Sequence, residues 1–468
     1  LESIENHSRK DWLELGRSSN TRRIVYMTTQ DKYKIKVGDN LESLKKLPDQ
    51  SVHCVVTSPP YWGLRDYGTG TWEGGDEDCD HVADPTATKK FGNEEFNKNC
   101  PSREMTKTKG YYEDTCPKCG AVRTDSQLGQ EDTPQEFVEN LVVLFREIHR
   151  VLREDGTVWL NLGDSYAGNC SRGSDNGRAG YGTKREGVFT KGGDGLKTKD
   201  LVGIPWRVAL ALQSDGWWLR QDIIWSKPNP MPESVRDRCT KAHEYIFLLT
   251  KNKKYYYDNE AIKEDAGNWG TRDRTNGKYN SEHNELLGAD HAGLVGKEWE
   301  ENPKKNKRSV WHVAPKPFAG AHFAVYPTEL IEPCILAGTS EKGCCANCGS
   351  PHERVVERTR IKRSELPKDD PRYRPNDYHG AYEEINGKGD AGYSSTKTTG
   401  WQPTCNCTTT DTVPCTVLDP FSGSGTTGIV SINNGRDYIG LELNPEYAEI
   451  SINRITEECP NTLTEFMQ

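Results

Sequence analysis

The chain has 468 residues, of which 28% are charged, and a formal net charge of −9. No run approaches the roughly 20 apolar residues that cross a bilayer, so a membrane-spanning protein is excluded, and residues 1–5 have no signal-peptide character. The acidic balance argues against a protein that coats nucleic acid without specificity, although clusters of Lys and Arg could still line a local groove.

The first half of the chain predicts alternating strands and helices. In chain order, we expect a strand at 33–37, a helix at 40–47, a strand at 52–56, a helix that begins at Pro134 and ends before Asp155-Gly156, a strand at 157–162, a helix at 205–213, and a strand at 218–225. The helix after Thr133 has a capping box and apolar residues at helical spacing. Residues 245–250 and 255–258 predict an antiparallel hairpin.

The C-terminal part continues the alternation with a strand at 417–418, a helix at 426–433, a strand at 438–443 and a final helix capped by Asn444. Strands that alternate with helices imply an α/β fold with a doubly wound, mostly parallel sheet, which we assign to residues 28–460. Polar stretches interrupt the alternation, and we interpret them as insertions at 63–132, 167–200, 258–310 and 343–410. Residues 168–200 are expected to form a loop that orders when a partner binds.

A glycine turn follows the strand at 417–418, and its sequence runs Asp419-Pro420-Phe421-x-Gly423-x-Gly425-Thr426. Glycines allow the backbone to approach a ligand more closely than side chains would permit. Glu442 ends the next strand, where an acidic residue typically holds ribose hydroxyls. The turn therefore indicates a nucleotide-like ligand, with a dinucleotide as one alternative.

A second motif, Ser58-Pro59-Pro60-Tyr61, follows the strand at 52–56. The lone pair of an exocyclic amino group on a base is delocalised into the ring, so a catalyst must accept hydrogen bonds from its N–H groups. The Ser58 hydroxyl and the Pro59 carbonyl can accept them, and Pro60 helps to fix that carbonyl. Tyr61 offers a flat face on which an extruded base can stack.

Together, these two motifs resemble those of β-class S-adenosylmethionine-dependent DNA amino-methyltransferases, in which the catalytic motif precedes the cofactor motif. The resemblance spans residues from about 31 to about 455 and implies a Rossmann-like catalytic domain with permuted motif order. It implies S-adenosylmethionine as the cofactor and the following binding residues: Asp39, Phe323, Asp419, Pro420, Phe421, Gly423, Gly425, Thr426 and Glu442. Asp39 has an equally good reading as the N-cap of the helix at 40–47. The residues that would border the base are Trp62, Asp164 and Lys227.

The serine form of the catalytic motif, preceded by Thr57 and followed by Trp62, resembles the cytosine-N4 enzymes of the family. The resemblance therefore implies site-specific methylation of double-stranded DNA, with adenine-N6 methylation as the close alternative. A catalytically inactive, zinc-stabilised DNA-binding protein is the alternative of another class. The family also implies a cytoplasmic location in a prokaryotic cell or a virus-infected host, and it leaves open a cognate restriction endonuclease. The motifs do not give the recognised sequence or the oligomeric state.

Fifteen cysteines in such a chain favour metal sites over disulfides, and their spacing predicts two structural zinc sites. The first would use Cys79, His81, Cys116 and Cys119, and the second Cys345, Cys348, Cys405 and Cys407. Cys344 could replace Cys345, although only Cys345 has the usual knuckle spacing. Unligated thiols or a redox-active pair are the alternatives.

Overall fold

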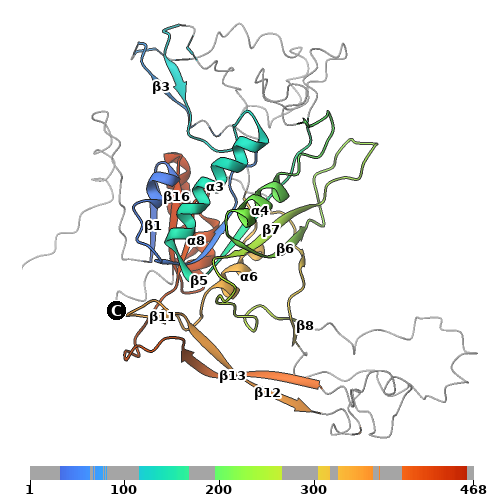
Figure 1. The fold of residues 1–468 in the computed structure, drawn as a ribbon, viewed down its shortest axis with the longest axis vertical. Helices are drawn as coiled ribbons and strands as arrows, with labels where there is room; N and C mark the ends of the chain where they lie inside the picture. The colour runs from blue at the N-terminus through green and yellow to red at the C-terminus, as the bar shows by residue number, and fades with distance from the viewer. Residues whose placement is uncertain are drawn as a thin grey trace, which may run out of the picture.

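The protein is described by a computed structural model over residues 32–63, 67, 69–76, 78–79, 81, 115–116, 118–167, 195–265, 304–316, 325–361, 368 and 393–460. Its centre is an eight-stranded sheet with the order β1-β16-β15-β2-β5-β7-β6-β10 (Figure 1). These strands are β1 (Tyr33–Val37), β2 (Val52–Thr57), β5 (Leu152–Leu162), β6 (Trp218–Ser226), β7 (His243–Thr250), β10 (Val310–His312), β15 (Thr416–Asp419) and β16 (Asp437–Glu442).

The strands of this sheet run parallel except for β7, which pairs antiparallel with both β5 and β6. The carboxyl ends of the other strands and the start of β7 therefore share one edge, which we call the carboxyl edge. In a doubly wound sheet, ligands bind at this edge. The predicted fold class, a mostly parallel α/β sheet, is confirmed.

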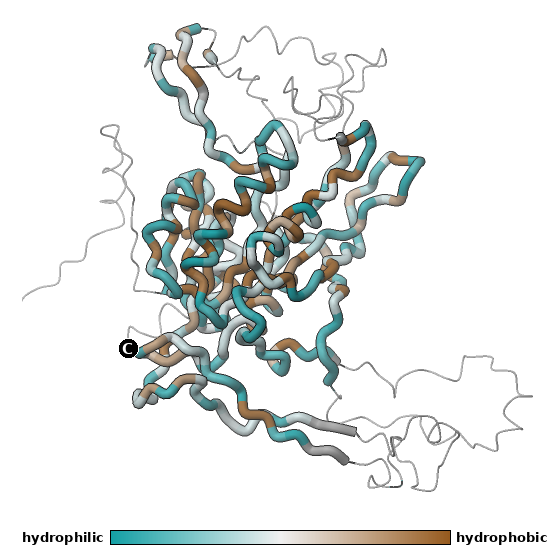
Figure 2. Tube along the Cα trace, in the orientation of Figure 1, coloured by the Kyte–Doolittle hydropathy of each residue, from teal (hydrophilic) through white to brown (hydrophobic). Residues whose placement is uncertain are grey.

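Helices cover both faces of the sheet because the strand residues alternate between two cores. The helices are α1 (Asn40–Leu44), α3 (Pro134–Val151), α4 (Ile204–Ser214), α6 (Thr328–Gly338), α8 (Thr426–Asn433) and α9 (Pro445–Glu458). Val55 of β2 joins a core with α1, α3 and α4, whereas its neighbours Cys54 and Val56 join a core with α6 and α8. Figure 2 shows the apolar residues concentrated in the sheet and its covering helices.

Small two-stranded sheets lie beyond the central sheet. They are β3 (Thr71–Glu73) with β4 (Val122–Thr124), β8 (Glu264–Asp265) with β9 (Lys304–Lys305), β11 (Cys344–Cys345) with β14 (Thr412–Val413), and β12 (His352–Ile361) with β13 (Tyr393–Pro403). The β3 and β12–β13 elements lie at opposite ends of the molecule (Figure 1). Among the described residues, no helix has both the length and the apolar character needed to cross a membrane.

Two predicted elements were wrong in detail, and one helix was missed. The hairpin of 245–250 with 255–258 does not form, because β7 pairs with β5 and β6 and residues 255–258 are not a strand. The helix α3 ends at Val151 and passes directly into β5, so Asp155-Gly156 lies inside the strand rather than at a helix stop. Helix α6 was not predicted, because Pro333 lies inside it. Residues 168–194, for which an ordering loop was predicted, lie outside the described residues.

Candidate active site

The two sequence motifs meet at the carboxyl edge of the sheet. Strands β2 and β15 are parallel neighbours, with Cys54 opposite Val417 and Val55 opposite Leu418. At their ends, the Thr57 hydroxyl donates a 2.7 Å hydrogen bond to Oδ1 of Asp419. The Ser58 turn and the glycine turn therefore leave adjacent strands in the same direction, although more than 350 residues separate them in the chain.

Asp419 is the centre of a buried polar cluster. Its Oδ2 accepts hydrogen bonds from Thr427 at 2.7 Å and from Tyr326 at 3.1 Å, and its Oδ1 accepts from the backbone N–H of Phe421 at 3.0 Å. The side chain is 1% exposed, and burial raises the pKa of its carboxyl. The oxygens of Asp419 therefore hold the start of the turn.

Glu442 lies across the glycine turn with its carboxylate held by backbone amides. Its Oε2 accepts from the N–H of Gly423 at 2.8 Å and its Oε1 from the N–H of Asn444 at 2.9 Å, and burial raises its pKa to about 7. Next to it, Gly38 donates its N–H to the Glu442 carbonyl and has a φ of +133°, with no described atom within 4 Å of where a Cβ would lie. An oriented carboxylate beside a glycine that opens onto free space fits a cofactor with ribose hydroxyls.

The other predicted cofactor residues divide into two groups. Phe421 is half-buried beside the turn, and the backbone N–H of Gly423 donates a hydrogen bond to Glu442. Gly425 has a φ of +77°, and a Cβ there would come within 2.3 Å of Ser451 Oγ, so packing against α9 requires this glycine. Pro420 and Thr426 are likewise buried, and Thr426 accepts a hydrogen bond from Arg454.

Asp39 acts as the N-cap of α1, because its Oδ1 accepts from the N–H of Glu42 at 2.9 Å. Of its two predicted roles, the structure shows the capping one, at the carboxyl edge directly after β1 and Gly38. Phe323 lies outside the described residues.

In the catalytic motif, the Tyr61 hydroxyl is fixed by two acceptors. It lies 2.7 Å from Oε2 of Glu244 and 3.1 Å from Oδ1 of Asn161. Burial, followed by the charge of Glu244, raises the pKa of Tyr61 well above its ordinary value, so the phenol stays protonated. A Cβ on Gly163 would come within 2.4 Å of the Tyr61 ring, which shows how closely this strand end supports it.

Glu244 links the catalytic motif to the strand β6. Its Oε1 forms an ion pair with Lys227, whose ammonium lies 4.2 Å from the centroid of the Trp225 ring. Lys227 was predicted to border the base. In the structure it contacts Glu244, which in turn accepts the hydrogen bond from Tyr61. Ser58 is half-buried. A contact from its side chain lowers the pKa of Tyr61, but burial has the larger effect and raises that pKa overall.

Two predicted base-pocket residues make defined contacts within the protein. Trp62 is 4% exposed within the main core, and its Nε1 donates to the carbonyl of Glu131 at 2.9 Å. Oδ1 of Asp164 accepts from the backbone N–H groups of Gly203 and Ile204, so Asp164 stabilises the start of α4. In this structure Trp62 packs, and Asp164 caps a helix.

Sequence reasoning missed Glu244 and Tyr326. Glu244 directly precedes the predicted strand 245–250, and its signal was an acid among apolar residues at the carboxyl edge. Tyr326 shares a hydrogen-bond cluster with Asp419 and Thr427, but nothing in the local sequence indicates that it packs against a turn about a hundred residues away.

Both predicted sets of metal ligands come together. The donor atoms of Cys79, His81, Cys116 and Cys119 lie within 4.8 Å of one another, as do those of Cys345, Cys348, Cys405 and Cys407. Four thiolate or imidazole donors at such separations fit a closed tetrahedral zinc site. In the first cluster the His81 ring also stacks on Trp72, with centroids 4.8 Å apart.

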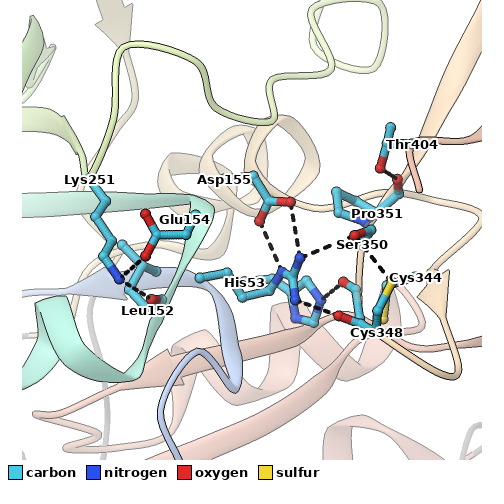
Figure 3. A network of polar contacts seen from close by, with 12 residues as sticks. His53, Leu152, Glu154, Asp155, Lys251, Cys344, Cys348, Ser350, Pro351 and Thr404 are labelled. Atoms are coloured by element: carbon cyan, nitrogen blue, oxygen red, sulfur yellow. Dashed lines mark hydrogen bonds and ion pairs between the residues drawn. The ribbon is translucent and has the colours of Figure 1, made fainter. Parts of the chain in front are cut away.

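The second cluster is attached to the amino edge of the sheet, since its partners His53 and Arg153 lie at the starts of β2 and β5. Figure 3 shows the polar network around His53, Asp155 and Cys348. Arg153 donates to the carbonyl of Cys348 at 2.9 Å and to Asp155 at 2.9 Å, and Nε2 of His53 donates to the carbonyl of Gly349 at 2.8 Å. Nδ1 of His53 accepts from the N–H of Thr416, so both of its ring nitrogens have backbone partners.

Cys344 is not part of the four-donor set, because its thiol lies with His53 and Cys415 instead. Cys345 is therefore the residue placed to bind metal, as its knuckle spacing predicted.

Two converging turns at the carboxyl edge of an α/β sheet, one suited to an amino group and one to a nucleotide-like cofactor, define an amino-methyltransferase site. Comparison with known proteins agrees. The family model for N6/N4-type DNA methylases matches residues 52–346 and 414–453, and the chain belongs to this family of β-class, S-adenosylmethionine-dependent DNA methyltransferases.

The chain is similar along most of its length to named relatives. The type II methyltransferase M.Cfr9I of Citrobacter freundii is 35% identical over 91% of this chain and 88% of that protein. M.SmaI of Serratia marcescens is 34% identical over 90% of each chain. Among solved structures, the cytosine-N4-specific PvuII DNA methyltransferase aligns with a TM-score of 0.44 and 14% identity, over 95% of this chain and 97% of that one.

Proposed function

We propose that the protein methylates the exocyclic N4 amino group of cytosine at a specific sequence in double-stranded DNA. The observation that carries the proposal is the Thr57–Asp419 hydrogen bond at 2.7 Å, which joins the amino-binding turn to the cofactor turn. The choice of cytosine rests on the serine at position 58 in Thr57-Ser58-Pro59-Pro60-Tyr61.

Within this proposal, Glu442 holds the ribose of the cofactor, and Phe421 and the Gly423 backbone border its amino-acid end. When bound, S-adenosylmethionine supplies an electrophilic methyl group on a sulfonium. Asp419 is assigned to the same cofactor site, and it keeps the glycine turn in place through Thr57, Thr427 and Tyr326. We therefore assign the cofactor and the base to the two halves of the carboxyl edge.

The catalytic motif then prepares the amino group. The extruded base stacks on Tyr61, whose hydroxyl is held by Glu244 and Asn161. The Ser58 hydroxyl and the Pro59 carbonyl accept the two N–H groups and favour a pyramidal nitrogen with its lone pair free. The methylated amine carries one extra proton, which leaves through Ser58 to water, so a strong general base is not required.

The polar insertions complete the proposal. We assign residues 167–200 and 258–310 to target recognition and DNA contact, and residues 63–132 and 343–410 to zinc-stapled insertions. Because the relatives are named as type II methyltransferases, we also propose a cognate restriction endonuclease that acts at the same sequence.

The test is to incubate plasmid DNA with the enzyme and S-adenosylmethionine, digest the DNA to nucleosides, and identify the modified base by mass spectrometry. We expect N4-methylcytosine, and we expect it to disappear with Ser58→Ala while cofactor binding persists. N6-methyladenine would establish the alternative target, and DNA binding without any methyl transfer would establish the inactive binding protein. Sequencing the methylated sites identifies the recognised sequence.

A further inference from the structure

An exposed apolar side chain lies on the loop that follows Lys227. Met231, in the loop of residues 227–242 between β6 and β7, is 86% exposed, more than any other large hydrophobic residue in the described part of the chain. Prolines at positions 230 and 232 flank it and restrict the backbone on both sides. An isolated methionine this exposed contributes nothing to the core of the protein.

The loop behind Met231 is held in place by polar contacts. Glu233 accepts hydrogen bonds from the Arg238 guanidinium at 2.6 Å and from the N–H of Lys241 at 3.2 Å. Arg238 in turn lies over the Tyr166 ring at 3.9 Å, and the Lys241 ammonium donates to the Asp164 carbonyl. Met231 therefore lies on a loop whose conformation is held by these contacts, which we call the braced loop.

The braced loop starts beside the catalytic tyrosine. Lys227 pairs with Glu244, and Glu244 accepts the hydrogen bond from Tyr61. Met231 is four residues beyond Lys227, so its Cα lies at most about 14 Å from the Cα of Lys227 at the length of an extended chain. That span is a few base steps of a duplex, which puts Met231 within reach of the base pairs next to an extruded base.

The charges around Met231 suit a duplex. Arg236 is exposed on the same loop, where a basic side chain can neutralise a phosphate beside an inserted residue, whereas Arg238 and Lys241 are engaged by Glu233 and Asp164. DNA-binding proteins use Met, Leu and Phe as wedges that separate neighbouring base pairs, and base extrusion requires the stack beside the target to open.

We propose that Met231 is a wedge that enters the base stack next to the target and supports its extrusion toward Tyr61. The inference rests on the proposed function, because it requires a target base that leaves the duplex. It adds a positioning residue that does not touch the reacting atoms. The gap that opens beside the target would be filled by the Met231 side chain, which buries its exposed apolar surface.

The first readout measures the opening of the stack. A duplex carries 2-aminopurine beside the target base, at the site found by sequencing, and its fluorescence rises when the stack opens. The wild-type enzyme should give a rise that Met231→Ala largely removes and Met231→Leu keeps. The matched control is Val413→Ala, which truncates a side chain that is 44% exposed on β14, away from the active site.

The second readout is single-turnover methyl transfer on two substrates. With a fully paired duplex, Met231→Ala should be slower than wild type by about tenfold or more, and with the target base opposite an abasic site the difference should shrink to about threefold or less, because that base is already unpaired. Equal losses on both substrates, or an unchanged fluorescence rise with Met231→Ala, would overturn the wedge. Modified adenine in place of cytosine would overturn the proposed function and leave these readouts intact, since they follow whichever base is methylated.

Discussion

Replacing Glu244 with glutamine tests whether the fixed position of Tyr61 contributes to the reaction. The substitution keeps the shape of the side chain but removes the charge that accepts the Tyr61 hydroxyl at 2.7 Å and pairs with Lys227. Lys227 retains its contact with Trp225, so the surrounding packing is preserved. Glu244→Gln therefore changes mainly the strength of the contact that orients the ring.

The size of the effect follows from the type of hydrogen bond. A bond from a hydroxyl to a charged group contributes about 1.5–3 kcal/mol, and each 1.4 kcal/mol in a barrier changes the rate about tenfold. The Asn161 acceptor at 3.1 Å remains and keeps part of the orientation. We therefore expect single-turnover methyl transfer to fall about 10- to 50-fold, with little change in cofactor affinity, because Glu442 and the glycine turn are untouched.

The assay is methyl transfer from labelled cofactor to duplex DNA, with cofactor binding followed separately by calorimetry. The matched control is Glu154→Gln, which removes another Glu–Lys pair, with Lys251 at 2.7 Å, at the amino edge of the sheet. It should leave the rate unchanged. Tyr61→Phe combined with Glu244→Gln should be no slower than Tyr61→Phe alone, since both remove the same bond. A wild-type rate for Glu244→Gln, or fully additive losses in the double variant, would refute the argument.

Five further outcomes follow from the structure. Burial raises the pKa of Glu442 to about 7, so its side chain ionises as the pH rises through neutrality. The cofactor affinity measured by calorimetry should therefore increase between about pH 6 and about pH 8, because the carboxylate is the better acceptor for ribose hydroxyls. Glu442→Gln should remove this pH dependence. The same raised pKa means that the contribution of Glu442 to the free energy of unfolding decreases as the pH rises from about 4.5 through about 7, which thermal unfolding at different pH values can measure. Thr57→Val should lower the free energy of unfolding by about 2 kcal/mol in denaturant titrations, since it leaves buried Asp419 without one donor. Gly163→Ala should displace the Tyr61 ring and slow methyl transfer at unchanged cofactor affinity. Zinc content, measured by mass spectrometry, should fall from about two to about one ion per chain with Cys119→Ser or with Cys348→Ser. Cys119→Ser should have the larger effect on the rate of DNA methylation, and Cys348→Ser should have the larger effect on the melting temperature.

The sequence predicted the alternating sheet and its two key turns because each depends on local patterns. Capping at Thr133 and Asn444, apolar spacing in α3 and the glycine turn all act over a few residues, and the structure has each of them. The two candidate sets of metal ligands were also predictable, because a Cys-x-x-Cys knuckle carries its geometry in its spacing. The structure then brought both four-donor sets together.

The contacts that sequence could not provide are those across the sheet. Nothing near Tyr326 or Glu244 in the chain indicates that they meet Asp419 and Tyr61, because the strand order brings them together. For the same reason the hydrogen bond from Nε1 of Trp62 to the Glu131 carbonyl could not be read from the sequence. A polar motif fixes its own turn, but its partners depend on which strands become neighbours.

The two candidate metal clusters are attached to different parts of the protein, and this explains the different outcomes expected for their variants. The first lies with β3 and β4 in the insertion that packs on the catalytic motif, where Gly63 donates to the Gly129 carbonyl and Asn444 donates to the Tyr67 carbonyl at 3.3 Å. The second is joined through Arg153 and His53 to the amino edge. If both sites bind zinc as we propose, its loss at the first should loosen the surroundings of the base and cofactor, and its loss at the second should free the β12–β13 hairpin from the far end of the sheet.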